Sequence, residues 1–235
     1  MNDVATPRRP DEHGVPDPFP YMHPTLRANF GNWDWHDRPR PGVLHHVSKS
    51  GDEVWTVRAG TQRQMDVFTI RTLCDIADEF ADGHMRFTTR SNAEFMVTSE
   101  DKTGPLIERL NAAGFPVGGT GNSLSMISHT QGWLHCDIPG TDASGVVKSL
   151  MDELMHEFTN EEMPNRVRMT TSCCLINCGG QGDIAFNVQY VKPPTINHDL
   201  VAIVCERPAV VARCPVAAIR PAMVNGKPSL EVDEK

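Results

Sequence analysis

The sequence predicts an α+β protein in which a ferredoxin-like half-domain is followed by an α/β domain and preceded by an extended, proline-rich arm. Residues 53–114 have the periodicity of strand, helix, strand, strand and helix in that order, which is typical of a compact ferredoxin-like unit. Residues 142–191 have the pattern of one helix followed by two strands. Residues 1–42 contain prolines at a density that disfavours helix and favours extended backbone.

The arm, residues 1–42, also carries interleaved aromatic side chains. A purely disordered tail rarely contains that many of them. We therefore expect the arm to lie across a surface of its own domain or of a partner, with a flexible tail as the alternative. The large apolar residues are Phe19, Tyr21, Leu26, Phe30, Trp33 and Trp35.

The half-domain is expected over residues 43–116. The stretch EVWTVRAG alternates as a strand does, and residues 64–83 have helical spacing that stops at Gly83. Two short strands should lie on either side of Ser91-Asn92, and a helix should end at Gly114.

The next domain is expected over residues 117–205. It opens on a glycine- and serine-rich stretch that would let the backbone approach a ligand closely. Its helix begins near Asp142 or Ser144, either of which is a suitable N-cap. Farther along, Asn225-Gly226 is typical of a β-hairpin turn.

The composition excludes several classes of function. The 235-residue chain has a formal charge of −8, which argues against binding to nucleic acid or to a membrane surface. No apolar run approaches the roughly 20 residues that a membrane-spanning helix needs. The N-terminal sequence has no apolar core of the signal-peptide type, so we expect a cytoplasmic protein.

The seven cysteines favour metal or redox chemistry over a disulfide framework, because their number is odd and no secretion signal is present. Structural zinc sites usually draw on two spaced pairs of ligands. Here Cys173, Cys174 and Cys178 are bunched and Cys136 lies far upstream. This uneven spacing favours an iron–sulfur cluster over a zinc site, while burial as small apolar side chains is a further alternative. We prefer that last reading for Cys74 and Cys205.

Two further features point to an anionic or bulky ligand. Gly179-Gly180 directly follows Cys178 and leaves space beside a thiolate. Two pairs of arginines, Arg86 with Arg90 and Arg166 with Arg168, have the spacing that puts both members of a pair on one face of a strand. Each pair could face one anion, although solvated surface arginines would have the same spacing.

Three stretches resemble the beta subunits of dissimilatory sulfite reductases. They are RFTTRSNAEFMV, GGTGNSLSMISHTQGWLHCDIPGTDASGVVKSLMDE and RVRMTTSCCLINCGG. The resemblance covers nearly the whole chain. The segments DEHGVPDPFPYMHP and RAGTQRQMDVFTIR are most similar to the version from sulfur-oxidising bacteria, which implies turnover in the oxidative, reverse direction.

The resemblance implies siroheme coupled to a [4Fe–4S] cluster. It assigns the cluster to Cys136, Cys173, Cys174 and Cys178, with Cys178 as an axial bridge to the siroheme iron. The carboxylates of the ring, or an anion above it, would face Arg86, Arg90, Arg166 and Arg168. The implied reaction interconverts sulfite and sulfide-level sulfur by six-electron transfer.

The resemblance also implies partners. In single-chain sulfite reductases, lysines on a basic strand hold sulfite, whereas Arg166 and Arg168 stand in the similar place here. The half that supplies the cluster in those enzymes does not supply the substrate-binding bases. We therefore expect an active site shared with an alpha subunit in an α2β2 heterotetramer, and we assign no catalytic residue to this chain. A small sulfur-carrier protein would be the other partner.

Residues 206–235 resemble the start of a ferredoxin-type domain. Cys214 would be its first cysteine, and a second [4Fe–4S] cluster would need cysteines beyond Lys235, so the sequence resembles a fragment. The alternatives to a catalytic subunit are a non-catalytic [4Fe–4S] electron-transfer or structural subunit, a siroheme nitrite reductase and a zinc-binding module.

Overall fold

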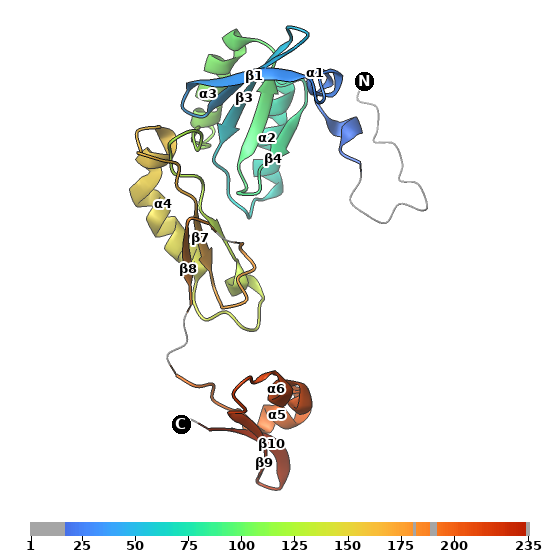
Figure 1. Ribbon diagram of the computed structural model, residues 1–235, viewed down its shortest axis with the longest axis vertical. Helices are drawn as coiled ribbons and strands as arrows, with labels where there is room; N and C mark the ends of the chain where they lie inside the picture. The colour runs from blue at the N-terminus through green and yellow to red at the C-terminus, as the bar shows by residue number, and fades with distance from the viewer. Residues whose placement is uncertain (1–16, 181, 189–191, 234–235) are drawn as a thin grey trace. The chain divides into compact units, whose positions relative to one another are not determined.

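The computed structural model describes residues 17–180, 182–188 and 192–233 (Figure 1). The chain divides into two compact units, Met1–Val188 and Gln189–Lys235. Within the described residues, no helix has both the length and the apolar character that crossing a membrane requires.

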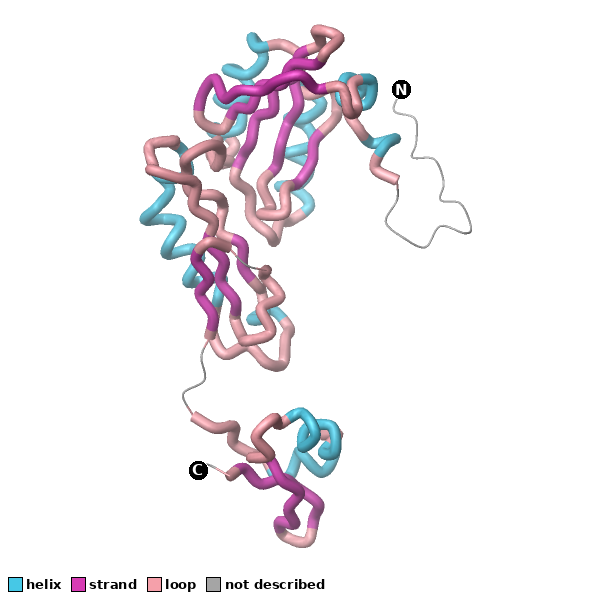
Figure 2. Tube along the Cα trace, viewed as in Figure 1, coloured by secondary structure: helices cyan, strands magenta, loops and turns pink. Residues whose placement is uncertain are grey.

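The first unit contains a five-stranded antiparallel sheet, visible as the magenta strands at the top of Figure 2. The strand order is β1-β2-β3-β5-β4. Because β3 and β5 are central, β5 is buried along its whole length. The predicted strands around residues 53–60 and 84–99 are confirmed. The strands are β1 (Trp33–Arg40), β2 (Val43–Ser48), β3 (Glu53–Ala59), β4 (Met85–Phe87) and β5 (Ala93–Val97).

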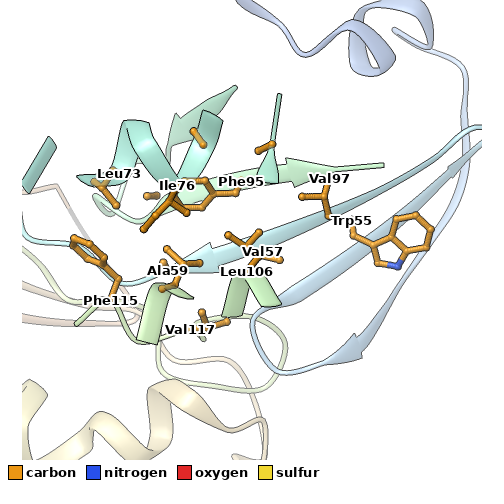
Figure 3. Close-up of a cluster of buried hydrophobic side chains, with 14 of the residues drawn as sticks. Trp55, Val57, Ala59, Leu73, Ile76, Phe95, Val97, Leu106, Phe115 and Val117 are labelled. Carbon is orange, nitrogen blue, oxygen red and sulfur yellow. The ribbon is translucent and has the colours of Figure 1, made fainter. Parts of the chain in front are cut away.

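Two helices, α2 (Val67–Phe80) and α3 (Thr103–Ala112), supply the main core of this unit together with β3 and β5 (Figure 3). Asp66 caps α2 by accepting a hydrogen bond from the backbone N–H of Thr69. A short 3-10 turn, η2 (Glu100–Lys102), precedes α3. Both helices lie where their apolar periodicity predicts. The core includes Val57, Ala59, Leu73, Ile76, Phe95, Leu106 and Leu110.

The described part of the arm, residues 17–42, is more structured than its prolines suggest. It forms a 3-10 turn, η1 (Phe19–Tyr21), the helix α1 (Pro24–Ala28) and strand β1. Pro24 is accommodated because it occupies the first helical position, where no backbone N–H is needed. β1 pairs with β2, so the end of the arm belongs to the sheet of its own chain. Residues 1–16 of the predicted arm lie outside the described residues.

The first unit continues into a small three-stranded parallel sheet with the order β6-β7-β8. Its helix, α4 (Ala143–Thr159), is capped by Asp142, which accepts hydrogen bonds from the backbone N–H groups of Ser144 and Gly145. The core of this part contains Leu124, Ile127, Val147, Met151 and Phe158. The strands are β6 (Ser128–His129), β7 (Met169–Ser172) and β8 (Ile184–Asn187), and a 3-10 turn, η3 (Gly132–Leu134), follows β6.

The second unit contains α5 (His198–Val204), α6 (Arg207–Arg213) and the antiparallel hairpin of β9 (Ile219–Val224) and β10 (Lys227–Val232). Asn225 and Gly226 have φ angles of +51° and +73°. Two successive positive φ values match the right-handed twist of a hairpin, which confirms the predicted turn.

The predicted domain boundaries after residues 42, 116 and 205 stay predictions. The division between the two compact units falls at Val188, inside the predicted 117–205 domain.

Candidate functional site

The cysteines gather where two parallel strands end. β6 leads, at its carboxyl end, into the segment that carries Cys136, and β7 leads directly into Cys173 and Cys174. Neighbouring parallel strands present their carboxyl ends at one edge of a sheet, and ligand sites of open α/β sheets lie outside such an edge. The topology therefore brings together cysteines that are distant in sequence.

Gly132 shows how closely Cys136 and Cys173 approach. A Cβ placed on Gly132 would lie 2.5 Å from the Sγ of Cys173 and 3.6 Å from the Cβ of Cys136. The backbone N–H groups of Gly140 and Thr141 donate to the carbonyl oxygen of Cys173 at 2.7 and 3.3 Å. The loop after Cys136 is thus fixed against the end of β7.

Thr130 connects the remaining cysteine segment to the same edge. Its Oγ1 accepts a hydrogen bond from the backbone N–H of Cys173 at 2.8 Å. A Cβ on Gly179 would lie 3.4 Å from Thr130, so the residue after Cys178 returns beside β6. Cys174 belongs to a small buried cluster with Cys173 and Ala143. All four predicted cluster cysteines therefore lie at one edge of the sheet.

The four thiols differ in exposure: Cys173 and Cys174 are buried, while Cys136 and Cys178 are exposed. Among the described residues, no three or more His, Cys, Asp or Glu side chains form a group that could hold a metal ion. A [4Fe–4S] cubane takes its four thiolates at four separate irons, so its ligands are spaced more widely than those of a single ion. The assignment of these cysteines to a cluster stays a prediction.

The glycines after Cys178 differ in their surroundings. A Cβ on Gly180 would meet nothing within 4 Å, and the φ angle there is +79°. Gly179 lies in ordinary contact with Thr130. The open space that the sequence predicts beside Cys178 is therefore on the Gly180 side.

A second group of residues, which we call the arginine group, consists of Arg58, Arg90, Arg166 and Arg168. Arg90 donates from Nη1 to the carbonyl oxygen of Met169 at 2.8 Å and to that of Met126 at 3.3 Å. Arg166 donates from Nε to Ser125 Oγ at 3.1 Å and from Nη2 to the carbonyl oxygen of Gly119 at 3.2 Å. Within the described part of the chain, neither Arg90 nor Arg166 forms an ion pair with a carboxylate.

The members of the arginine group lie close enough to repel one another. Burial lowers the pKa of Arg166, and repulsion from Arg58, Arg168, Arg90 and Arg38 lowers it further. Burial lowers the pKa of Arg90 as well, with a further contribution from Arg168 that Asp183 partly opposes. Guanidinium groups stay protonated despite such shifts, so an anionic ligand would relieve the repulsion.

Neither predicted arginine pair lies within one strand. Arg166 and Arg168 precede β7, which begins at Met169, and they flank Val167, which forms an isolated bridge to Leu124. They influence one another electrostatically. Arg168 also pairs with Asp183, with 3.7 Å between Nη1 and Oδ1. The expectation that Arg86 and Arg90 share a strand face is wrong, because β4 ends at Phe87.

Arg86 is exposed and donates from Nε to Glu94 Oε2 at 2.6 Å. Arg58, which the sequence analysis missed, binds the same carboxylate: its Nε and Nη2 each lie 2.7 Å from Glu94 Oε1. Arg58, Glu94 and Arg86 are directly opposite one another on β3, β5 and β4. The signal in the sequence was weak: a charged residue interrupts the apolar residues near the end of β3 and at the start of β5.

Of the other cysteines, Cys74 is on α2 of the first unit, and Cys205 and Cys214 belong to the second unit. Backbone hydrogen bonds, the largest from Ile219, lower the pKa of the Cys214 thiol, and the N–H of Ala218 lies 3.3 Å from its Sγ. These donors would stabilise a thiolate at Cys214. The interpretation of Cys74 as a buried apolar residue is wrong, since Cys74 is exposed, and Cys205 is only partly buried.

Comparison with known protein families gives a match over residues 46–113 to the nitrite/sulfite reductase ferredoxin-like half domain. Two solved structures have a similar fold. The crystal structure of dissimilatory sulfite reductase I (DsrI) has a TM-score of 0.73 and 15% identity, covering 88% of this chain and 57% of that chain. The Mycobacterium tuberculosis NirA protein has a TM-score of 0.52 and 14% identity, covering 62% and 30%. At these identities the likeness concerns the fold alone.

Three curated relatives carry the same description, dissimilatory-type sulfite reductase subunit beta. The protein from Megalodesulfovibrio gigas is 46% identical over 94% of this chain and 90% of its own length. Those from Nitratidesulfovibrio vulgaris and Archaeoglobus fulgidus are 44% and 42% identical over 94% and 91% of this chain, but the chain spans only 58% and 61% of their lengths. By its identity to these proteins and its coverage of the first, the chain belongs to the family of dissimilatory-type sulfite reductase beta subunits.

Proposed function

We propose that this chain is the beta subunit of a siroheme-dependent dissimilatory sulfite reductase, which interconverts sulfite and sulfide-level sulfur by six-electron transfer. One observation carries the proposal: four cysteines lie at one sheet edge, in the same compact unit as Arg90 and Arg166, which have no carboxylate partner among the described residues. The descriptions of the relatives support it.

The residues that would hold a [4Fe–4S] cluster are Cys136, Cys173, Cys174 and Cys178, and Cys178 would also hold the siroheme. The donor set fits, because four thiolates are what such a cluster requires. Cys173 and Cys174 are buried and would exclude water from the cluster, while Cys178 is exposed next to the open side of Gly180. When bound, the siroheme and cluster supply a sulfur-binding iron and one-electron transfer.

The arginine group and Arg86 would hold the carboxylates of the tetrapyrrole or a sulfur oxyanion. Guanidinium binds such groups through two parallel hydrogen bonds, which fixes orientation as well as charge. Arg168 and Cys173 lie on either side of the four-residue strand β7, roughly 16 Å of extended chain at about 3.3 Å per residue. Only a large ligand can contact both ends of that strand, and a tetrapyrrole is of that kind.

The chain would work within a larger assembly. We propose an α2β2 complex in which the alpha subunit supplies the substrate-binding bases, with a small sulfur-carrier protein delivering substrate in the cytoplasm. The oxidative direction rests on the similarity of the arm and of residues 58–71 to proteins of sulfur-oxidising bacteria. Cys214, surrounded by backbone donors, would begin the ligand set of a second [4Fe–4S] cluster.

Co-purification with the alpha subunit tests the proposal. We expect iron, acid-labile sulfide and the visible absorption bands of siroheme in the complex, and faster turnover of sulfite than of nitrite. The beta chain purified alone should show little sulfite turnover. Sulfide and iron without siroheme bands would identify a non-catalytic cluster subunit instead. Faster turnover of nitrite than of sulfite would identify a nitrite reductase. Zinc without acid-labile sulfide would identify a zinc-binding module and contradict an iron–sulfur cluster.

A further inference from the structure

We propose that Glu94 is a positioning residue: it holds Arg58 at a fixed place beside Arg166, so that the two guanidinium groups meet the carboxylates of the bound tetrapyrrole together. This inference rests on the proposed function and deepens it, because it identifies a residue that would act on the ligand only through another side chain.

Glu94 is an unusual residue for the centre of a sheet. Its side chain is 1% exposed, although glutamate is almost never fully buried unless it is paired. Both of its carboxylate oxygens are engaged, Oε1 by Arg58 and Oε2 by Arg86. The three residues are in register on adjacent strands, so the sheet itself determines the geometry of the pair.

Arg58 uses its third guanidinium nitrogen to reach outside the sheet. Its Nη1 donates to the carbonyl oxygen of Gly119 at 2.6 Å, and Arg166 Nη2 donates to that same oxygen at 3.2 Å. One carbonyl therefore holds two like-charged groups side by side. Arg58 already shares the carboxylate of Glu94 with Arg86, so a further anion would relieve the remaining repulsion between Arg58 and Arg166.

The shared carbonyl is itself rigid. The backbone N–H of Gly119 donates to the carbonyl oxygen of Phe158 at 2.7 Å, and a Cβ on Gly119 would lie 2.6 Å from the ring of Phe158. Phe158 is fully buried. Because Gly119 is held against the buried Phe158, the position that Glu94 gives to Arg58 contributes directly to its distance from Arg166.

Two roles for Glu94 predict opposite effects of removing its charge. If Glu94 acted only as a negative charge near the site, E94Q would make the site more positive, and an anionic ligand would be held more tightly. If Glu94 positions Arg58, E94Q replaces one of the two accepting oxygens with an NH2 group that can only donate, so the pairing with the two arginines is broken, Arg58 loses its orientation and the ligand is held less tightly. E94D keeps the charge but is one methylene shorter, and it should weaken binding only in the positioning role.

The experiment measures siroheme loss from the complex with the alpha subunit, followed by its visible absorption after dilution. We expect the rate of loss to rise about tenfold in E94Q and in E94D, the loss typical of a disrupted charged hydrogen bond, with acid-labile sulfide unchanged because the cysteines are untouched. Slower loss in E94Q with no change in E94D would overturn the proposal, as would wild-type rates in both. A wild-type complex without siroheme would instead contradict the proposed function.

Two further variants complete the test. Glu79 is a matched control, an exposed glutamate paired with Arg109 at 3.7 Å, and E79Q should lose siroheme at the wild-type rate. R58K keeps the charge but not the forked geometry, and the proposal predicts faster loss there as well. If E94Q fails to assemble, E94D and R58K still test the proposal, and a wild-type rate in either would refute positioning. The E94Q/R58K double variant should lose siroheme no faster than the more affected single variant. If the two effects add, Glu94 acts on the ligand independently of Arg58.

Discussion

Gly132 offers a steric test of the cysteine arrangement. Gly132→Ala adds a Cβ that would lie 2.5 Å from Cys173 Sγ and 3.1 Å from Pro139 Cβ. Nonbonded heavy atoms prefer separations of about 3.5–4.0 Å, so the sulfur must move by roughly 1 Å. Cys173 is 4% exposed and packs against fully buried Ala143, which leaves little room for that movement.

The magnitude follows from the size of the overlap. Inserting one methyl group into a filled site typically costs about 1–3 kcal/mol. Gly132 is not among the residues with a positive φ angle, so alanine fits its backbone and the effect is steric alone. A thiolate displaced by about 1 Å no longer meets its iron at bonding distance, and we expect the variant to lose most of its cluster as well as stability.

The assay combines acid-labile sulfide per beta chain in the purified complex with the thermal unfolding midpoint. Gly104→Ala is the control, because a Cβ there meets nothing within 4 Å and the site lies in α3. Its stability should be unchanged or raised by up to about 1 kcal/mol. Wild-type sulfide content and an unchanged midpoint in Gly132→Ala would refute the inferred contact between this loop and Cys173.

Two other variants test the fold. Asp142→Ala removes the cap that accepts from Ser144 and Gly145, and it should lower the free energy of unfolding in urea by about 1 kcal/mol; if Asp142→Asn lost as much, the cap would not be the cause. Burial lowers the pKa of His23 below its ordinary 6.5, and the partly opposing hydrogen bond to Asp82 does not reverse this. In this pH range His23 therefore binds a proton more readily in the unfolded chain than in the folded chain. The free energy of unfolding should fall as the pH drops below about 6.5, and it should be constant above that pH. His23→Gln should flatten that slope between roughly pH 5 and 7, and equal slopes in the two proteins would contradict the assignment.

The elements of the fold could be predicted from local patterns. Periodicity indicated α2, α3 and α4, and Asn225-Gly226 indicated the hairpin, because capping and turn conformations depend on neighbouring residues. The arm was predicted less well. Its proline content did not indicate that Pro24 occupies the first turn of the helix α1. It also did not indicate the edge strand β1, which depends on pairing with β2.

The parts of the site that depend on the spacing of residues along the sequence could be predicted. The parts that depend on the register between paired strands could not. The bunched cysteines indicated a shared ligand, and the structure brings Cys136 to Cys173 through parallel pairing of β6 with β7. The Arg58–Glu94–Arg86 alignment depends on which strands are neighbours, which no local pattern contains. The assumed strand from Arg86 to Arg90 failed for the related reason that strand ends are set by pairing, and β4 is short.

The central claim, that Cys178 links a four-cysteine cluster to siroheme, is tested most directly by measuring iron, acid-labile sulfide and siroheme absorption in complexes that carry Cys178→Ser. Cys74→Ser is the matched control, since Cys74 is an exposed thiol on α2. The account predicts that Cys178→Ser loses both the sulfide and the siroheme bands of the beta chain while Cys74→Ser keeps them. Full sulfide and siroheme content in Cys178→Ser would contradict it.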